Sequence, residues 1–330
     1  MPSIDLITPE KRTPDIDMIH LRVISPSDLT EKVVGLLAGD PGVLNLVVLP
    51  GRARNPDGDA IECDVLGGTA NTVLSSLRRL QVDRRGSIVI EPVELAISGR
   101  TTDAATQQLG ALANAPVWEE VEGRIRADGT YSPSFYLFLI IAGVIGAVGI
   151  LTNSQILIVA AMVLGPEYGA ITSIALGLDR HSGQAVREGL SALTVGFLLA
   201  IVAAFAFALL VRVLGLEPAA FRLGIRPVTK LIDTPNFYSL VVAVLAGIVG
   251  IVSLTHARTS TLLGVFISVT TIPAASDIGV ASAFGSWSEA RGSLLQLLLN
   301  IVVLIVVGVL TLRFVRLLWR RISNRRDRDA

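Results

Sequence analysis

The chain has few cysteines and histidines, which many catalytic and metal sites use. Among its 330 residues there are one cysteine and three histidines. The single cysteine, Cys63, excludes an intrachain disulfide, and so small a set does not form a zinc-binding pattern. The sequence also lacks a G-x-x-x-x-G-K loop for ATP and a G-x-S-x-G nucleophile elbow. We therefore expect no catalytic residues, no metal site and no enzymatic activity, and the sequence assigns no cofactor.

An excess of charge of either sign is missing as well. Lys and Arg together number 28, as do Asp and Glu, so the formal net charge is zero and gives no basis for binding nucleic acid. The chain is instead rich in apolar residues, which make up 51% of it and give a mean hydropathy of +0.63. This excess lies after residue 133, so we expect the lipid bilayer to be the main partner.

The first 17 residues are polar and include Pro2, Pro9 and Pro14. They lack the apolar core and the cleavage site of a signal peptide. We expect a flexible arm on the cytoplasmic side of the membrane.

Residues 18–93 have the pattern of a small soluble α+β domain. Apolar and polar residues alternate in four segments, which predicts strands at 18–24, 43–49, 60–66 and 87–91. Helices are predicted after Ser25-Pro26 and from Gly67, and a loop rich in turn residues is predicted at 51–58. The order β-α-β-β-α-β is typical of the ferredoxin-like fold.

That fold places both helices on one face of its sheet and leaves the other face open. The open face would carry His20, Arg22, Glu62 and Asp64. These side chains could form cross-strand ion pairs on a solvated face, or they could form a regulatory ligand or subunit surface. Arg52 and Arg54, in the predicted loop, could hold an anion or could be solvated.

Residues 94–132 are predicted to be a helical connector. Within it, 117–127 is amphipathic, with Val117, Val121 and Ile125 at helical spacing. This helix could pack as a connector or lie at the membrane surface. The membrane domain follows at 133–318, with a basic cytoplasmic tail at 319–330. Its six predicted spans lie at about 135–152, 154–178, 190–214, 237–255, 259–284 and 294–318.

The second and fifth spans are both interrupted and both acidic. Glu167 follows Pro166 directly, and Asp277 follows Pro273 by four residues. A proline removes a helix hydrogen bond, and an acid at membrane depth is costly unless it faces a cavity, a partner or a proton. The alternative is that the prolines only kink the helices and the acids lie near the surface. The predicted substrate or ion pathway comprises Pro166, Glu167, Thr271, Pro273, Ser276, Asp277 and Asn300.

The membrane domain contains an internal repeat, at about 133–215 and 235–318. Gly146 is matched with Gly247 and Pro166 with Pro273, and spacings run from about 101 to 108 residues. Each half has three predicted spans, so the second half enters the membrane from the opposite side. The prediction is a 3+3 inverted repeat, which is common among secondary transporters. Small residues four apart, as in Ala142/Gly146 and Ala243/Gly247, predict close helix packing within or between subunits.

Lysine and arginine set the expected orientation. Ten basic residues flank one side of the predicted spans and five flank the other, so both termini are expected in the cytoplasm, with the protein in the inner (plasma) membrane. The arginines near the C-terminus could contact anionic lipid. The ten are Arg180, Arg187, Arg258, Arg313, Arg316, Arg320, Arg321, Arg325, Arg326 and Arg328.

Three segments resemble a known family. The runs AAMVLGPEYGAITSIALGL, TTIPAASDIGVASAFG and LLQLLLNIVVLIVVG resemble the bacterial membrane family called domain of unknown function 389. The resemblance extends over nearly the whole chain. It implies this architecture but no activity, since the family has none established.

Two functions are compatible with these patterns. The first is a transporter or channel for a small solute or ion, regulated by its cytoplasmic domain. The second is a membrane-anchored ligand sensor or scaffold without transport. In both cases we expect a homo-oligomer, because the open sheet face and the small-residue helix faces need cover.

Overall fold

The computed structural model describes residues 18–93, 116–224, 232–255 and 271–329. The chain divides into two compact units. One comprises residues 1–121 with 319–330, and the other comprises residues 122–318.

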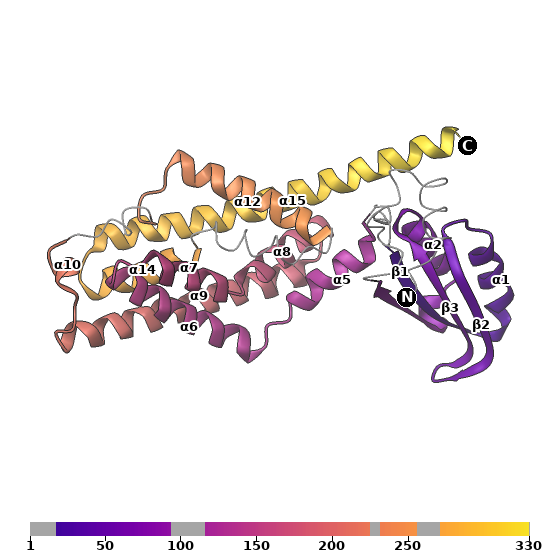
Figure 1. Ribbon diagram of the computed structural model, residues 1–330, viewed down its shortest axis with the longest axis horizontal. Coiled ribbons are helices and arrows are strands. Elements are labelled where there is room, and N and C mark those ends of the chain that lie inside the picture. Colours follow the sequence, from indigo (N-terminus) through magenta and orange to yellow (C-terminus); the bar gives the residue numbers. More distant parts are fainter. Residues whose placement is uncertain (1–17, 94–115, 225–231, 256–270, 330) are drawn as a thin grey trace, which may run out of the picture. The chain divides into compact units, whose positions relative to one another are not determined.

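The first unit contains a four-stranded antiparallel sheet. Its strands are β1 (Met18–Ser25), β2 (Val43–Arg54), β3 (Asp57–Leu66) and β4 (Ser87–Pro92), and they lie in the order β2-β3-β1-β4. Helix α1 (Ser27–Ala38) follows β1, and α2 (Gly67–Arg79) follows β3 (Figure 1). The predicted order of strands and helices is confirmed, with one helical turn, α3 (Val82–Arg85), added before β4.

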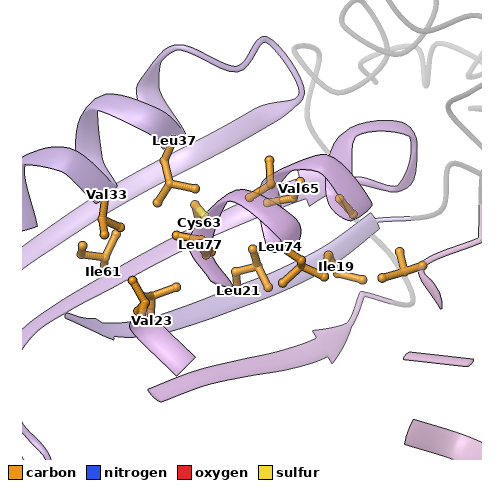
Figure 2. Close-up of a cluster of buried hydrophobic side chains, with 14 of the residues drawn as sticks. Ile19, Leu21, Val23, Val33, Leu37, Ile61, Cys63, Val65, Leu74 and Leu77 are labelled. Carbon is orange, nitrogen blue, oxygen red and sulfur yellow. The ribbon is translucent and has the colours of Figure 1, made fainter. Parts of the chain in front are cut away.

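The core of this unit lies between the sheet and its two long helices (Figure 2). Alternate residues of β1 and β3 point into it, because side chains alternate across a strand. Burial of each large aliphatic side chain contributes about 1.5–3 kcal/mol. Cys63 lies in this core, where burial raises the pKa of its thiol to about 12 and leaves it unreactive. The fully buried core residues include Leu21, Val23, Val33, Leu37, Ile61, Val65 and Leu77.

The predicted loop at 51–58 is wrong. β2 continues to Arg54 and β3 begins at Asp57, so Arg52 and Arg54 lie on a strand of a long hairpin. The turn residues instead accommodate a register shift between Leu49 and Ala53, where Gly51 has a φ of 62°. A bulge bends the strand without ending it, which a count of turn residues does not reveal.

Asp59 holds this bulge in place. It accepts hydrogen bonds from the Thr30 hydroxyl at 2.6 Å and from the Gly51 backbone amide at 2.7 Å. The Thr30 bond, followed by the Gly51 bond, lowers the pKa of Asp59 below its ordinary value. The folded state therefore gains stability from this carboxylate above its unfolded pKa, and loses it as the pH falls through the lower folded pKa.

The remaining described elements are helices. They are α5 (Trp118–Asp128), α6 (Pro133–Leu151), α7 (Gln155–Leu164), α8 (Glu167–Asp179), α9 (Gly183–Val213), α10 (Ala219–Arg222), α12 (Phe237–Thr255), α14 (described from Thr271 to Ala283) and α15 (Trp287–Asp329). The amphipathic helix predicted at 117–127 is confirmed as α5. Val117, Val121 and Ile125 are buried, which fits a packed helix.

Four of these helices are long and apolar enough to span a membrane: α6, α9, α12 and α15 up to Trp319. The pair α7 and α8 passes the same test as one span bent by 48°. The described residues thus contain four candidate spans, or five with the bent pair. The first part of the predicted fifth span, residues 259–270, lies outside the described residues.

Two predicted ends differ from the structure. α9 begins seven residues earlier than the predicted third span, at Gly183, where the Ser182 side chain caps the Ala185 amide. α15 begins seven residues earlier than the predicted sixth span, at Trp287, and its candidate span ends at Trp319, close to the predicted 318, although the helix itself continues to Asp329. Basic residues end an apolar segment, but they are good helix formers and do not end the helix.

Small residues bring the membrane helices together inside one chain. A β-carbon added to Gly146 would overlap the Ser276 hydroxyl, and one added to Gly247 would lie 2.9 Å from the Val307 side chain. Ala142 and Ala243 are buried too. The predicted close packing is confirmed, and these positions serve contacts within the chain.

Candidate functional site

The centre of the candidate site is the break between α7 and α8. Ser154 caps the start of α7, which ends at Leu164, and Gly165 is extended, with a φ of −71° and a ψ of 122°. Pro166 precedes α8 and has no amide to donate. The interruption predicted at Pro166 is therefore confirmed. A break of this kind leaves the last carbonyls of one helix and the first amides of the next without helical partners.

Glu167 is the first residue of α8 and is 7% exposed. The Thr271 hydroxyl donates a hydrogen bond of 2.6 Å to its Oε1. Its Oε2 is buried and has no hydrogen-bond partner among the residues that the structure describes. The N-terminus of α8 favours a negative charge at this position.

Gly165 lies tightly against the Glu167 carboxylate. A β-carbon added to Gly165 would overlap Glu167 Oε2 and would lie 2.8 Å from the Ile272 side chain. Any larger residue at position 165 would therefore have to displace one of these neighbours. The break thus combines a buried carboxylate, an oxygen without a hydrogen-bond partner among the described residues, and a glycine packed closely against it.

Asp277, the second predicted acid, has a different environment. It lies inside α14, is 1% exposed, and accepts a 2.6 Å hydrogen bond from the Ser293 hydroxyl of α15. One turn and two turns further along α15, Gln296 and Asn300 are buried, and Gln296 donates to Asn300 at 3.1 Å. Ser239 of α12 approaches Gln296 Oε1 at 3.4 Å. Asp277 and Asn300 thus belong to polar contacts that join α12, α14 and α15.

The two acids are linked to different positions of α14: Glu167 bonds Thr271 at the start of its described part, and Asp277 is one of its own residues. Thr271, the partner of Glu167, precedes Asp277 by six residues, which is about 9 Å along a helix and about 120° around it. Ser276 donates back to the Ile272 carbonyl of its own helix at 3.0 Å, and Pro273 is buried in the same turn. The structure therefore brings Glu167 and Thr271 together. A single pathway lined by both acids stays a prediction.

The open face of the sheet carries the other predicted site residues. His20 Nδ1 lies 2.8 Å from Asp64 Oδ1, and Asn45 donates to Asp64 Oδ2 at 2.6 Å. Arg22 lies opposite Glu62 in the β1–β3 register, and its nearest acid oxygen is that of Glu91 at 3.9 Å. This geometry fits a solvated face with cross-strand ion pairs. Ligand binding by this face, or by Arg52 and Arg54 on the hairpin, stays a prediction.

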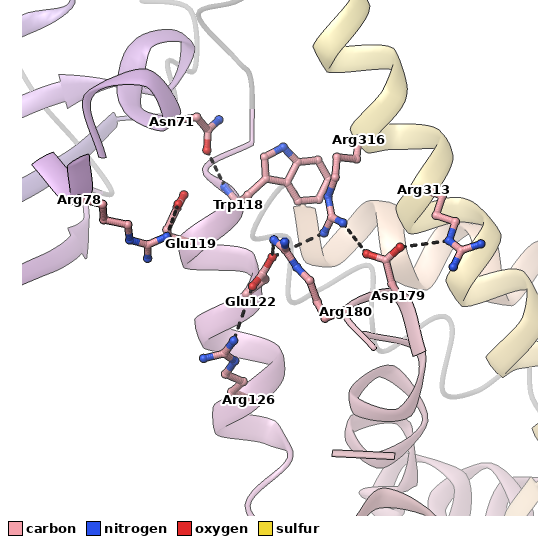
Figure 3. A network of polar contacts seen from close by, with 10 residues as sticks. All are labelled: Asn71, Arg78, Trp118, Glu119, Glu122, Arg126, Asp179, Arg180, Arg313 and Arg316. Carbon is pink, nitrogen blue, oxygen red and sulfur yellow. Dashed lines mark hydrogen bonds and ion pairs between the residues drawn. The ribbon is translucent and has the colours of Figure 1, made fainter. Parts of the chain in front are cut away.

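Sequence reasoning missed a polar cluster at one end of the membrane unit, which we call the Asp179 end (Figure 3). Asp179, the last residue of α8, accepts hydrogen bonds from two arginines of α15. Arg316 donates to Oδ2, and Arg313 donates to Oδ1 at 3.1 Å. Arg316 also lies 3.5 Å from Glu122, which Arg180 contacts as well. The side chains of Asp179, Glu122 and Arg316 are 5%, 14% and 13% exposed, so this is a largely buried network.

A second missed contact closes the opposite end of the unit, which we call the Arg212 end. Arg212, near the end of α9, donates a 2.6 Å hydrogen bond to the Ala283 carbonyl at the end of α14. Its guanidinium lies 5.7 Å from the centre of the Phe284 ring, which packs edge-on against Phe221. Arg212 thus satisfies a carbonyl that the end of α14 would otherwise leave free.

In comparisons with known proteins, no curated protein and no solved structure matches the chain. A family model matches residues 162–306, which hold Glu167, Thr271, Asp277 and Asn300. The match confirms the resemblance found in the sequence and carries no activity with it. Residues 162–306 are therefore similar to the family described as domain of unknown function (DUF389).

Proposed function

We propose that the membrane unit crosses the bilayer six times and that both ends of the crossing region lie at one membrane face. Glu122, just before the first span, lies 3.5 Å from Arg316, at the end of the last span. Two residues in contact at one end of a helix bundle share a membrane face, so the number of crossings between them is even. Four long spans and the bent pair make five, which leaves one further crossing.

The course of α12 and α14 supports that sixth crossing. α12 runs alongside α15 in the same direction, since Ser239 approaches Gln296 and Gly247 packs on Val307 (Figure 1). Thr255 therefore belongs to the Asp179 end, whereas Ala283 belongs to the Arg212 end. The last residue of α12 and the last residue of α14 thus lie at opposite ends of the unit, which fits one further crossing.

We further propose that the two halves are inverted repeats related by a constant spacing of 104 residues. α6 and α12 begin at 133 and 237, α9 and α15 begin at 183 and 287, and α8 and α14 end at 179 and 283. Positive φ angles recur at His181 and Gly285. This spacing pairs Gly143 with Gly247 and Gly146 with Gly250, one helical turn away from the pairing of Gly146 with Gly247 expected from sequence.

Contacts between the halves are reciprocal at this spacing. Arg316 of the second half bonds Asp179 of the first, and Arg212 of the first bonds Ala283 of the second. In the same way, Gly308 packs on Ala175 and Gly279 packs on Ala204. Each contact recurs with its members exchanged between halves, as a twofold relation requires, and the exchange swaps the two ends of the unit. A twofold axis in the membrane plane fits this pattern.

Glu167 and Thr271 are themselves 104 residues apart and bond each other. Under the proposed symmetry they are equivalent positions, so their contact lies on the axis between the halves. Transporters with inverted repeats place their binding sites near the membrane midplane at broken helices. The observation that carries our proposal is this buried carboxylate at a helix break on the axis, with one oxygen that has no hydrogen-bond partner in the part of the chain that the structure describes. The function that it supports best is transport of a small ion or solute between the halves.

The test is flux through the purified protein in liposomes. Vesicles carrying the parent chain and a trapped dye for H⁺, Na⁺ or K⁺ should dissipate an imposed gradient of at least one of these ions faster than protein-free vesicles. Glu167→Gln should remove that flux, and the exposed matched change Glu188→Gln on α9 should keep it. Parent vesicles that equal protein-free vesicles for all three ions would argue against ion transport and favour the sensor or scaffold.

The orientation with both termini in the cytoplasm is part of the same proposal. In a Cys63→Ser chain, a cysteine placed at Asn324 should resist a membrane-impermeant maleimide in intact cells and react after lysis. Labelling in intact cells would show that the C-terminus lies outside, which contradicts the proposed orientation. A role for the sheet domain in regulation and in forming a homo-oligomer is also proposed; deletion of residues 1–93 should then change the flux or the oligomeric mass in detergent.

A further inference from the structure

We propose that two copies of this chain pair through the open face of the sheet, related by a twofold axis that runs along the strands between β1 and β3. This inference rests on the homo-oligomer proposed above and names its surface, its symmetry and its partner, which is a second copy of the same chain.

The strand registers place one row of four side chains across the open face. The row crosses β2, β3, β1 and β4 in that order and consists of Val47, Glu62, Arg22 and Val89. Residues directly opposite each other on paired strands point to the same face of a sheet. This face is the one away from the core, because the buried core takes the alternate residues of β1 and β3 (Figure 2). From one edge to the other, the row therefore reads apolar, acidic, basic, apolar.

The side chains of this row are poorly satisfied within one chain. Val47 is 46% exposed. Arg22 is half-exposed and reaches only Glu91, at 3.9 Å, and Glu62 forms no ion pair with the residues that the structure describes. Leu49, next to Val47 on the same face, is exposed as well. Exposed aliphatic side chains beside loosely paired charges are typical of a surface that a partner covers.

A twofold axis along the strands turns this row onto its own complement. Rotation about an axis between β1 and β3 brings β1 of one copy over β3 of the other, and β2 over β4. Arg22 then faces the partner's Glu62, and Val47 faces the partner's Val89. Each contact occurs twice with its members exchanged, as an interface between identical subunits requires. The charges and the apolar side chains of the row are thus complementary to those of a second copy.

Charge selects this axis over the other one that lies in the plane between two sheets. An axis across the strands would place Arg22 over the partner's Arg22 and Glu62 over the partner's Glu62, and these like charges repel each other. Sheets that pack face to face keep their strands within about 30° of each other, which an axis along the strands allows.

The rows on either side agree with the same axis. In one of them His20 faces the partner's Asp64, which adds a second contact of basic with acidic groups. In the other row Ile24 faces the partner's Ala60, which is an apolar contact. The two rows are Leu44-Asp64-His20-Glu91 and Leu49-Ala60-Ile24-Ser87.

The first test exchanges charges in the full-length protein in mild detergent. Arg22→Glu and Glu62→Arg are purified with different tags, and the dissociation constant of the dimer is measured for each variant and for their mixture. Each variant alone should associate at least about tenfold more weakly than the parent, because like charges face each other across the axis. The mixture should recover the parent's affinity, since opposite charges then meet at both contacts. Lys32→Glu and Glu31→Arg, exposed on α1, are the matched controls and should associate like the parent.

The second test does not depend on charge. Val47→Cys and Val89→Cys chains are mixed and treated with a short bis-maleimide, and a covalent dimer should form between the two kinds of chain. Val47→Cys alone should give none, because β2 and β4 are three strand spacings apart, or about 14 Å. Cys63 stays in place, since it is fully buried. If the membrane units alone hold the charge variants together, this cross-link decides the result.

Three outcomes would overturn the proposal: a parent chain that is monomeric in detergent, a mixture of charge variants that associates no better than each alone, or a mixture of cysteine variants that gives no cross-link. A monomer would mean that another molecule or another part of the chain covers the face. Transport is tested separately. A mixed cross-link without flux in liposomes would keep the dimer and contradict transport, whereas flux from a chain that stays monomeric would keep transport and contradict the dimer.

Discussion

The two ends of the membrane unit are closed by the same contact made with different chemistry. At the Asp179 end, Arg316 and Arg313 of α15 bond a carboxylate at the end of α8. At the Arg212 end, the corresponding arginine of α9 bonds a backbone carbonyl at the end of α14 and covers an aromatic ring. The comparison shows that the two halves of a repeat can keep the same contact geometry while the strength of the contact differs between them. The Asp179 end rests on paired charges, so we expect it to be harder to open than the Arg212 end.

The largest effect is expected from breaking the charged end. Arg316→Ala leaves the buried carboxylates of Asp179 and Glu122 short of a cation, and breaking a buried pair costs about 3–5 kcal/mol. We expect about 3 kcal/mol, because Arg313 and Arg180 remain. Reversible unfolding in detergent measures it, with Arg126→Ala, 75% exposed, as the control. A loss no larger than that of the control would mean that the network contributes little.

The neutral end should lose less. Arg212→Ala removes one charge-assisted hydrogen bond to Ala283, which contributes about 1.5–3 kcal/mol, and the contact with Phe284. We expect about 2 kcal/mol by the same unfolding measurement. A loss greater than that of Arg316→Ala would reverse the ranking of the two ends.

The reciprocal glycines sharpen the comparison in the apolar part of the unit. A β-carbon at Gly279 would lie 2.7 Å from backbone atoms of Ile201 and Phe205, whereas one at Gly308 would lie 3.2 Å from the Ala175 β-carbon. Backbone cannot move aside as a side chain does, so Gly279→Ala should cost about 1–3 kcal/mol and Gly308→Ala less than about 1 kcal/mol. Equal costs would indicate that α9 and α14 separate as readily as α8 and α15.

The smallest effect concerns salt. Choline chloride screens exposed charges, and half-exposed Arg180 and Arg313 take part only at the Asp179 end. Raising it from 0.1 to 1 M should lower parent stability by less than about 1 kcal/mol. The decrease in stability with salt concentration should be smaller in Arg316→Ala and unchanged in Arg212→Ala. An unchanged slope in both variants would assign the salt effect to other charges.

Much of this arrangement follows from local patterns in the sequence. The order of strands and helices in the sheet domain and the helix break at Pro166 are visible there, because alternation, proline and apolar runs act locally. The sequence left open whether Glu167 and Asp277 are buried, and the structure shows that they are. The continuation of the β2–β3 hairpin beyond Leu49 could not be predicted from the sequence, because a bulge and a loop use the same residue types.

The register of the two halves and the contacts at their ends could not be predicted. Gly143, Gly146 and Gly149 recur every three residues, so an alignment slips by one turn without a visible penalty. Arg316 is one of seven arginines between 313 and 328, and only the fold selects it as the partner of Asp179. The two acids look alike in sequence, and only the structure shows that Asp277 lies inside α14 and bonds Ser293, whereas Glu167 begins α8 at the helix break and bonds Thr271.

The bond between Glu167 and Thr271 has a consequence for how the chain is made. The two residues are 104 positions apart, and a ribosome adds about 5–20 residues per second. Glu167 is therefore synthesised roughly 5–20 s before its partner exists. During that interval the first half must keep an acid without its hydroxyl donor, either protonated in lipid or exposed to water in the translocation machinery. Completion of the second half supplies Thr271 and, later, Arg316, so the first three helices reach their final arrangement only after the last helix has been inserted.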